Sequence, residues 1–509
     1  MPDRFEIVGR SSPQLDLRVD DLPPPTVREL HRQNPWWEGR SARPIPAFRR
    51  WPFAKLRERL LRPLAPVLVL RGPRQVGKTT LLEQLVGALL RDERIPPHRI
   101  FRVQFDELAW LAKLGDDPIL RLVSWYERVV FRGDLNESAA RGEPAFVFLD
   151  EVQNLDNWHT QIKALVDHTA VRVLVTGSSA LRIARGRDSL AGRIQMIEMG
   201  PMRPAEIAAL RGLGDLPSYQ GANGYEAWRD EEFWRGLAAH GERYRALRDA
   251  AFALFAERGG YPLAHREGVA WEEIADQLVQ TVVDRVIEHD LRLGERGRRR
   301  DPVLLREVFK LACRYTGQAP SVRKLTEDVQ LVHAGNAGPQ RVAHYLDFLH
   351  QSLLVTLVDP LEIQLRRMRA PKKICLTDHA LRAAILREEV PLARPVEDPR
   401  LAELAGRIAE GIVGAYLGSM PGLGLAWRPE RSGKPELDYV ATVGDQRIPI
   451  EVKYQRRIDP VRDIAALRSF LEELGERAPF GLLVTRSDGV IVDDPRIVAV
   501  PLPSFLLLR

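Results

Sequence analysis

The residues with the clearest chemical pattern lie between Gly72 and Thr79, where the chain reads GPRQVGKT. This G-x-x-x-x-G-K-T spacing follows an apolar, strand-like run at 67–70 and precedes an amphipathic helical stretch. Such glycines let backbone N–H groups close around phosphate oxygens, and the following helix adds the positive end of its dipole. We expect ATP here, with Lys78 reaching the β- and γ-phosphates and Thr79 a ligand of Mg²⁺. The expected nucleotide contacts are Gly72, Pro73, Arg74, Gln75, Val76, Gly77, Lys78, Thr79 and Thr80.

A second pair of chemical groups follows the apolar run FVFL at 146–149. Asp150 and Glu151 come at the end of this predicted strand, the edge at which open α/β sheets bind ligands. We expect Asp150 to hold Mg²⁺, and Glu151 to orient and polarise the attacking water as general base. The structural alternative for Asp150 is an acidic helix N-cap.

The stretches VLVTGSSALRI and SLAGRIQ supply further polar side chains. Ser178 or Ser179 would contact the γ-phosphate or its water, unless the two serines form a simple turn. Arg193 would be an arginine finger for the ATP of a neighbouring subunit, which predicts a homo-oligomer. Three other arginines compete for this role, namely Arg182, Arg185 and Arg187. For each arginine the alternative is a solvated surface charge.

Near the C-terminus, the stretch at 436–454 reads ELDYVATVGDQRIPIEVKY and predicts a hairpin. A two-residue turn at Gly444-Asp445 suits a type II′ or I′ geometry and places Asp438 directly across from Glu451. Facing Cβ atoms in such a pair lie about 4.5–5.5 Å apart, and like charges there are destabilising. The alternate positions are apolar, so that face of the hairpin is expected to join a core.

A divalent cation would resolve the repulsion between the two acids, because Mg²⁺ prefers carboxylates, waters and substrate phosphates. Lys453 points the same way as Glu451 and would position a nucleophilic water or stabilise developing charge. An amphipathic helix expected at 401–420 would bring Glu410 to the same cluster. In the alternative interpretation, Glu436 and Lys453 form an exposed ion pair, and the two acids splay into water.

The elements that position these groups follow a β/α order in the first part of the chain. Apolar strand-like runs alternate with helical stretches, which predicts a parallel sheet with crossover helices. We expect an α/β protein of five segments: an extended N-terminal arm (1–50), a P-loop core (51–200), a helical lid and connector (201–300), a winged-helix segment (301–370) and a mixed α/β domain (371–509).

The segment at 301–370 carries the pattern helix, helix, helix, strand that favours a winged helix. Its third helix would be the recognition helix, with Gln340, Arg341 and His344 as candidate DNA contacts. The basic stretch at 364–373 lies in the expected wing, where phosphates would be met. Winged helices also bind proteins or join domains, so DNA contact is one of two interpretations.

Composition limits the class of protein. The 509 residues suggest three or four domains, and 45% apolar and 28% charged residues are ordinary for globular proteins. Two cysteines exclude a disulfide framework, which suits a reducing cytoplasm. No apolar run approaches about 18 residues, so we expect no membrane span. The net charge of +6 hints at a polyanionic partner, although a GC-rich genome would also enrich arginine.

Together these motifs resemble the prokaryotic AAA+ ATPases that carry a C-terminal domain of unknown function. The matching pieces are RGPRQVGKTTL, FVFLDEVQN, VTGSSALRI, SLAGR, GGYP, KKICLTDHAL, and ELDYV followed by IEVKY. The resemblance implies an AAA+ core, a winged-helix segment and a tail similar to PD-(D/E)xK nucleases. It maps that nuclease pattern onto Asp438 and Glu451 as acids, Lys453 as the lysine and Glu410 as the helical acid. The family's D-x-G turn reads Asp378-His379-Ala380 here, a departure from the pattern.

Two functions follow from these expectations. The first is a Mg²⁺-dependent ATPase that couples its ATP state to DNA binding or processing. The second is an ATP-driven switch or scaffold that regulates a protein partner, with a catalytically silent tail. A DNA-binding regulator with a silent tail is a third interpretation.

Overall fold

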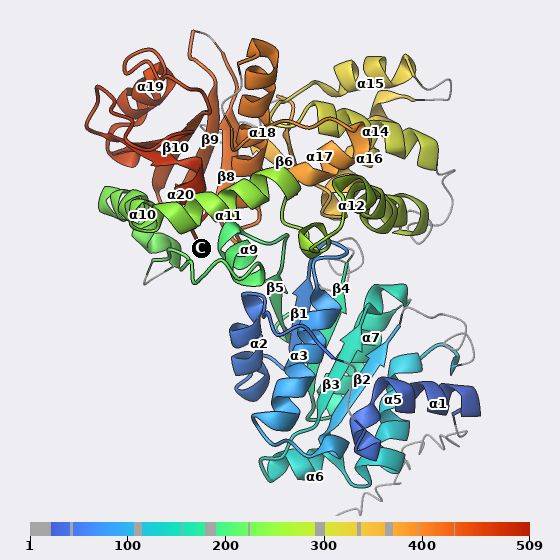
Figure 1. Cartoon of the computed structure of the whole chain (residues 1–509). Helices are drawn as coiled ribbons and strands as arrows, with labels where there is room; N and C mark the ends of the chain where they lie inside the picture. Colours follow the sequence, from blue (N-terminus) through green and yellow to red (C-terminus); the bar gives the residue numbers. More distant parts are fainter. Residues whose placement is uncertain are drawn as a thin grey trace, which may run out of the picture.

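The computed structural model describes residues 22–40, 44–105, 114–155, 157–178, 190–221, 224–290, 301–332, 337–361, 370–394, 397–431 and 433–509. Figure 1 shows two bodies, each built on one β-sheet, with strands β1 to β4 in the lower body and β6, β8, β9 and β10 in the upper one. Both bodies pack helices on sheets, so the predicted α/β class is confirmed. Within the described ranges, no helix is both long enough and apolar enough to cross a membrane.

The first sheet is parallel throughout, as predicted. Its strands are β1 (Val67–Arg71), β2 (Ile100–Gln104), β3 (Phe146–Asp150), β4 (Arg172–Gly177) and β5 (Ile194–Glu198). The spatial order is β2-β3-β4-β1-β5, and every neighbouring pair is parallel. Strand β4 therefore lies between the strand that leads into the phosphate loop and the strand that ends at Asp150. All carboxyl ends meet at one edge, where ligands of open α/β sheets bind.

Helices cover both faces of this sheet because its strands are apolar at successive positions. On one face, α2 (Pro52–Leu61) and α3 (Lys78–Arg91) share a core with strand residues such as Leu68 and Phe148. On the other face, α5 (Pro118–Tyr126) and α7 (Trp158–His168) pack on residues such as Val69 and Val147. Short helices η4 (Glu127–Phe131) and α6 (Leu135–Ala140) follow α5. Alternating side chains thus divide one strand between two cores.

The N-terminal arm is helical over residues 24–38, apart from Asn34, and this part covers the edge strand β2. It comprises α1 (Pro24–Gln33) and a 3-10 helix, η1 (Pro35–Glu38). The Asn34 side chain accepts from the Arg102 backbone N–H at 2.7 Å and donates to the Arg102 carbonyl at 2.8 Å. An exposed edge strand can pair with other chains. Here the Asn34 side chain occupies the backbone hydrogen-bonding groups of Arg102, as a neighbouring strand would. We expected an extended arm, and the helix is a correction.

The middle of the chain is helical, as predicted. It contains α9 (Pro204–Leu210), α10 (Glu231–Arg243), α11 (Arg245–Arg258), α12 (Trp271–Leu278), the π-helix η8 (Val279–Asp290), α14 (Pro302–Arg314), α15 (Val322–Gln330), α16 (Pro339–Gln351) and α17 (His379–Leu386). Helices α10 and α11 pack on the C-terminal helix α20 (Leu502–Phe505). Within the segment expected as a helical lid and connector, α10 and α11 thus support the second body.

The second sheet has seven strands in the order β12-β11-β10-β9-β8-β6-β7. These are β6 (Val355–Pro360), β7 (Lys373–Leu376), β8 (Gly424–Arg428), β9 (Leu437–Val443), β10 (Gln446–Lys453), β11 (Gly481–Thr485) and β12 (Ile497–Pro501). Strands β6 and β7 are antiparallel, and β6 also pairs with β8. The strand pair expected as a wing therefore continues the C-terminal sheet.

The hairpin of β9 and β10 has the predicted register. Val443 faces Gln446, and the pairing continues in step to Tyr439 and Ile450. Helix α18 (Pro399–Gly418) lies on the face that carries Tyr439, and α19 (Ala465–Leu474) covers the opposite face. The sequence predicted one apolar face, but both faces of the hairpin are buried, because α19 covers the second face.

Candidate functional site

The phosphate loop joins β1 to α3, and its backbone takes conformations that favour glycine. Gly77 precedes the helix with φ 94°, and Gln75 has φ 62°. A Cβ at Gly72 would lie 2.1 Å from the Met199 carbonyl oxygen, so only glycine fits beside β5. The Lys78 ammonium donates to the loop carbonyls of Gly72 at 3.0 Å and Pro73 at 2.8 Å. The loop thus holds its lysine at the start of α3, where the helix N–H groups point outward.

Asp150 ends β3 and is fully buried. Its Oδ1 accepts a hydrogen bond from the Thr176 hydroxyl, and its Oδ2 has no hydrogen-bond partner among the described residues. Burial, and then the neighbouring Glu151, raises the pKa of Asp150 to about 6, against hydrogen bonding from Thr176 and Thr79. The cation beside this oxygen is the Arg102 guanidinium, with Nη2 at 3.8 Å from Oδ2. A buried carboxylate oxygen that accepts no hydrogen bond, near the Thr79 hydroxyl, fits a hard cation such as Mg²⁺. The N-cap interpretation is wrong, because Glu151 precedes the next short helix and no side chain caps it.

Glu151 lies beside the loop lysine and is held by two polar side chains. Its Oε1 is 3.9 Å from the Lys78 Nζ, and its Oε2 accepts from Gln153 and, at 3.3 Å, from the Ser178 hydroxyl. The Gln153 amide also donates to Ser178 at 3.0 Å. Glu151 has φ 58°, an uncommon conformation for this residue type that often marks a functional site. The structure therefore brings Glu151, Lys78 and Ser178 together.

Gln153 is a functional candidate that sequence reasoning missed. Its signal was present in the run FVFLDEVQ, two positions after Glu151. The short helix η5 (Val152–Asn154) turns the chain so that this amide faces back toward Glu151.

Arg193 lies just before β5, at the amino-terminal edge of the first sheet. Strand β5 runs parallel to β1, with Ile194 beside Val67, so the phosphate loop follows the opposite edge. The Arg193 guanidinium binds Asp167 through Nε–Oδ1 at 2.5 Å and Nη2–Oδ2 at 3.2 Å. A contact between Arg193 and ATP would therefore need a second subunit.

Several other predicted residues lie outside the described ranges: Ser179, Arg182, Arg185 and Arg187.

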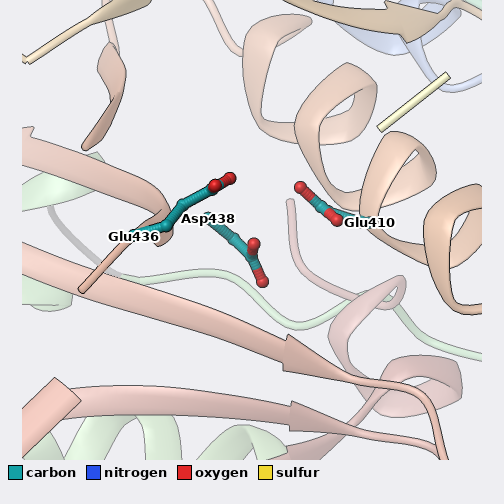
Figure 2. Close-up of side chains that lie close together, drawn as sticks. All are labelled: Glu410, Glu436 and Asp438. Atoms are coloured by element: carbon teal, nitrogen blue, oxygen red, sulfur yellow. The ribbon is translucent and has the colours of Figure 1, made fainter. Parts of the chain in front are cut away.

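A cluster of carboxylates forms in the second body. Figure 2 shows Glu410, from α18, pointing toward Glu436 and Asp438 at the start of β9. Oxygens of these three side chains all lie within 4.8 Å of one another. Among the described residues, Glu451 is not a member of this group. Its Oε1 instead accepts a hydrogen bond from the Lys453 ammonium at 2.6 Å. The predicted ligands Glu410 and Asp438 therefore come together, and Glu436, which was not a predicted ligand, joins them.

Asp438 and Glu451 do lie side by side on neighbouring strands. The Val452 N–H donates to Asp438 Oδ2 at 2.8 Å, and the Asp438 N–H faces Glu451 Oε2 at 3.5 Å. Burial, and then the charge of Asp438, raises the pKa of Glu451. Neither acid splays into water, because both side chains are buried.

The residue that organises the cluster is Lys373, which was expected in the basic stretch of the wing and not in this cluster. Its fully buried ammonium contacts Glu410 Oε1, Glu436 Oε1 at 3.3 Å and Asp438 Oδ1 at 3.5 Å. Burial lowers the pKa of Lys373, but the three carboxylates outweigh it and the net shift is upward. Burial and then Asp438 also raise the pKa of Glu410, although Lys373 opposes that rise. A charged lysine thus lies among acids that repel one another.

The expected DNA-binding face of α16 is partly exposed. Gln340 and His344 are exposed, while Arg341 lies over the Tyr345 ring at 5.8 Å. Most of the basic stretch at 364–373 lies outside the described residues. The two lysines that end this stretch pair within the protein, Lys372 with Asp359 at 3.3 Å and Lys373 in the carboxylate cluster.

The GGYP turn joins the two bodies. The Met202 N–H donates to the Gly260 carbonyl at 2.6 Å, and the Gly260 N–H donates to Asp378 Oδ2 at 2.6 Å. Asp378 also caps α17 by accepting from the Ala380 N–H at 2.8 Å. Ala380 lies in the first turn of a regular helix, so the departure from D-x-G leaves this cap intact.

Three stretches of the chain match known families. Residues 65–208 match an AAA domain family. This stretch is an AAA-like domain that carries the phosphate loop on a parallel sheet. It contains Lys78, Asp150 and Glu151, whose geometry is described above. Residues 250–391 match a Domain of unknown function (DUF8612), and residues 405–505 match a Domain of unknown function (DUF4143), which contains the predicted tail residues.

Curated relatives share part of the chain. An uncharacterized protein of Methanocaldococcus jannaschii, MJ1637, is 34% identical over 123 residues, which is 24% of this chain and 23% of that protein. Uncharacterized proteins of Mycobacterium bovis (Mb2031c) and Mycobacterium tuberculosis (Rv2008c) are each 28% identical over 287 residues, 51% of this chain and 58% of theirs. The chain therefore spans well under two thirds of the length of each of these relatives.

Solved structures show a distant likeness. The Walker-type ATPase PABY2304 of Pyrococcus abyssi aligns at 16% identity and a TM-score of 0.37, over 68% of this chain and 99% of that one. The Aeropyrum pernix ORC1 protein, solved in complex with DNA, aligns at 16% identity and a TM-score of 0.28, over 77% and 97%. With TM-scores this low, neither structure bears on what this chain binds.

Proposed function

We propose that this protein is a Mg²⁺-dependent ATPase that couples its ATP state to the second body. The observation that carries the hydrolysis is the meeting of Lys78, Asp150 and Glu151 at one edge of the AAA-like sheet. Asp150 Oδ2 and the Thr79 hydroxyl are the oxygens that would hold Mg²⁺. When bound, the ion would neutralise negative charge on the phosphates.

Each side chain then has a distinct role in hydrolysis. Lys78 exchanges its loop carbonyls for phosphate oxygens of ATP. Glu151 accepts a proton from the attacking water as general base. Ser178 and Gln153 hold the Glu151 carboxylate in place through the hydrogen bonds on its Oε2. In a homo-oligomer, Arg193 of a neighbouring subunit would supply positive charge to the transition state.

Coupling between the bodies runs through buried polar contacts. Arg50 donates to the Val76 carbonyl in the phosphate loop and to the Gly200 carbonyl at 2.9 Å. Beyond Gly200, Met202 binds the GGYP turn, and that turn binds Asp378 at the start of α17. A change in the loop on nucleotide binding would therefore displace groups that hold the second sheet.

Nucleic acid is the partner that the tail fits best. A cavity of about 370 Å³ lies next to Lys453, and its lining includes Arg394, Arg456 and Arg486. The acid in this lining, Glu403, is itself paired with Arg407. Cations around one cavity suit the phosphates of a DNA backbone. We therefore propose DNA as the partner, bound or processed in response to the ATP state.

A second candidate function is an ATP-driven switch or scaffold that regulates a protein partner, with a silent tail. The specific observation that favours a silent tail is the Lys373 ammonium among Glu410, Glu436 and Asp438. A buried lysine already compensates the acids that a nuclease would use to bind a metal.

ATP hydrolysis is tested by comparing Lys78→Ala and Glu151→Gln with the wild type. We expect Lys78→Ala to lose tight ATP binding, and Glu151→Gln to bind ATP but hydrolyse it at least about 100-fold more slowly. The matched controls are Lys163→Ala and the exposed Glu143→Gln, which should keep the wild-type rate. A Glu151→Gln protein that hydrolyses ATP at the wild-type rate would refute the assigned base.

The role of the tail is tested with plasmid, ATP, and Mg²⁺ or Mn²⁺. Cutting that is lost in Asp438→Ala and in Lys453→Ala would support DNA processing. Binding without cutting, weakened in an Arg394→Ala/Arg456→Ala double variant, would support DNA binding alone. Neither binding nor cutting, with ATP hydrolysis intact, would support the protein-directed switch.

A further inference from the structure

We propose that Lys373 occupies the position of a metal ion, so that the carboxylate cluster of the second body is a closed ionic cage rather than a metal-dependent cleavage site. The proposal concerns the tail alone and narrows the proposed function to a nucleotide-dependent module that does not cut. Because it does not rest on ATP hydrolysis, its failure would leave the assignment of Lys78 and Glu151 unchanged.

The Lys373 ammonium lies where a bound metal ion would lie. A divalent ion bound by Glu410, Glu436 and Asp438 would lie about 2.0–2.5 Å from an oxygen of each. Those oxygens are within 4.8 Å of one another, and the Lys373 Nζ already contacts all three side chains. The ammonium and the ion would therefore compete for the same small volume, and their positive charges would repel one another.

The Lys373 side chain is held in place by two aromatic rings. Its ammonium, from β7, lies 5.2 Å from the ring centre of Trp427 in β8 and 5.3 Å from the ring centre of Tyr439 in β9. The side chain has no exposed surface. Withdrawing it would leave a buried charge without carboxylate partners, which is costly in a protein interior.

The acids around Lys373 also have other partners or contact with water. Glu451 Oε1 accepts from Lys453, and Asp438 Oδ2 accepts from the Val452 N–H. Glu436 is 52% exposed, so water screens its charge. The two most buried acids of the cluster are thus compensated by Lys373 from within the chain.

The experiment counts Mn²⁺ ions bound to the nucleotide-free full chain by electron paramagnetic resonance of the free ion. We expect the wild type and Asp438→Asn to bind the same number of ions. Lys373→Met removes the charge but keeps the length of the side chain, so this variant should bind one more Mn²⁺ ion than the wild type. Adding Asp438→Asn to Lys373→Met should remove that ion.

The matched control is Lys372→Met, which changes the exposed neighbouring lysine and should leave the count unchanged. A wild-type Mn²⁺ site that disappears in Asp438→Asn would overturn the proposal. A folded Lys373→Met protein that gains no ion would also overturn it. If Lys373→Met does not fold, the comparison between the wild type and Asp438→Asn decides the matter.

Discussion

Arg50 binds both carboxylate oxygens of Glu206, with Nε–Oε1 at 2.7 Å and Nη2–Oε2 at 3.1 Å. The same guanidinium donates to the Val76 carbonyl in the phosphate loop. Both side chains are at most 10% exposed. Glu206 lies in α9, close after the last strand of the AAA-like sheet. One buried ion pair therefore links the nucleotide loop to the segment that leads into the second body (Figure 1).

The first prediction concerns the pH dependence of this pair. Burial raises the pKa of Glu206, but Arg50 and two backbone N–H groups outweigh it, so the pKa lies below the ordinary 4.5. Because the folded pKa is depressed, the stabilisation is present above pH 4.5 and is lost as the pH falls through the folded pKa. At pH 7, Glu206→Gln should cost about 3 kcal/mol of unfolding free energy, because it leaves Arg50 buried without a counter-charge.

Thermal unfolding of Glu206→Gln and the wild type from pH 7 downward checks this prediction. The difference in Tm should shrink below pH 4.5, where protonation neutralises the wild-type Glu206. Glu257→Gln, which removes an exposed partner of Arg258, is the control and should be nearly silent at every pH. A Tm difference that stays constant down to the acid limit would show that charge is not what Glu206 contributes.

The second prediction concerns Gly72 in the phosphate loop. An added Cβ would lie 2.1 Å from the Met199 carbonyl oxygen, and backbone cannot yield as a flexible side chain can. Gly72→Ala should therefore lose about 3 kcal/mol of stability and weaken ATP binding. Gly200→Ala, where an added Cβ meets no atom within 4 Å, is the matched control and should stay within about 0.5 kcal/mol of the wild type. Equal effects of the two changes in denaturant unfolding would contradict the close approach of β5.

The third prediction isolates the contact between the GGYP turn and α17. Gly259 and Gly268 both have a positive φ, 71° and 72°, and Gly259 has ψ −160°. A Cβ at Gly259 would lie 2.1 Å from Asp378 Oδ1, whereas one at Gly268 would meet nothing within 4 Å. Both alanine variants should lose at least about 1 kcal/mol through the backbone strain of a positive φ. Gly259→Ala should lose about 2 kcal/mol more, because Asp378 is buried and bound to two N–H groups.

Denaturant unfolding of the two variants measures this difference directly. In addition, ATP should change the protection of α17 from hydrogen exchange in the wild type and less so in Gly259→Ala, if the turn transmits the nucleotide state. Identical destabilisation by the two changes would show that the turn does not depend on its contact with Asp378.

The features that could be predicted from the sequence are those whose determinants lie close together along the chain. The spacing from Gly72 to Thr79 and the apolar runs before it predicted the loop, the helix and the parallel sheet. The turn at Gly444-Asp445 and the alternation of apolar residues predicted the register of β9 and β10, which the structure confirms. Local patterns suffice there because strand alternation and turn geometry act over a few residues.

The sequence by itself determined that phosphate-binding and acidic groups would follow parallel strands, and that two acids would oppose one another in a hairpin. Only the tertiary structure decided what neutralises the acids of the second body. The Lys373 ammonium reaches Glu410 and Glu436, 37 and 63 residues along the chain, across the face of a sheet. No local pattern encodes such a contact, because burial and packing of distant segments choose the partner of a charge.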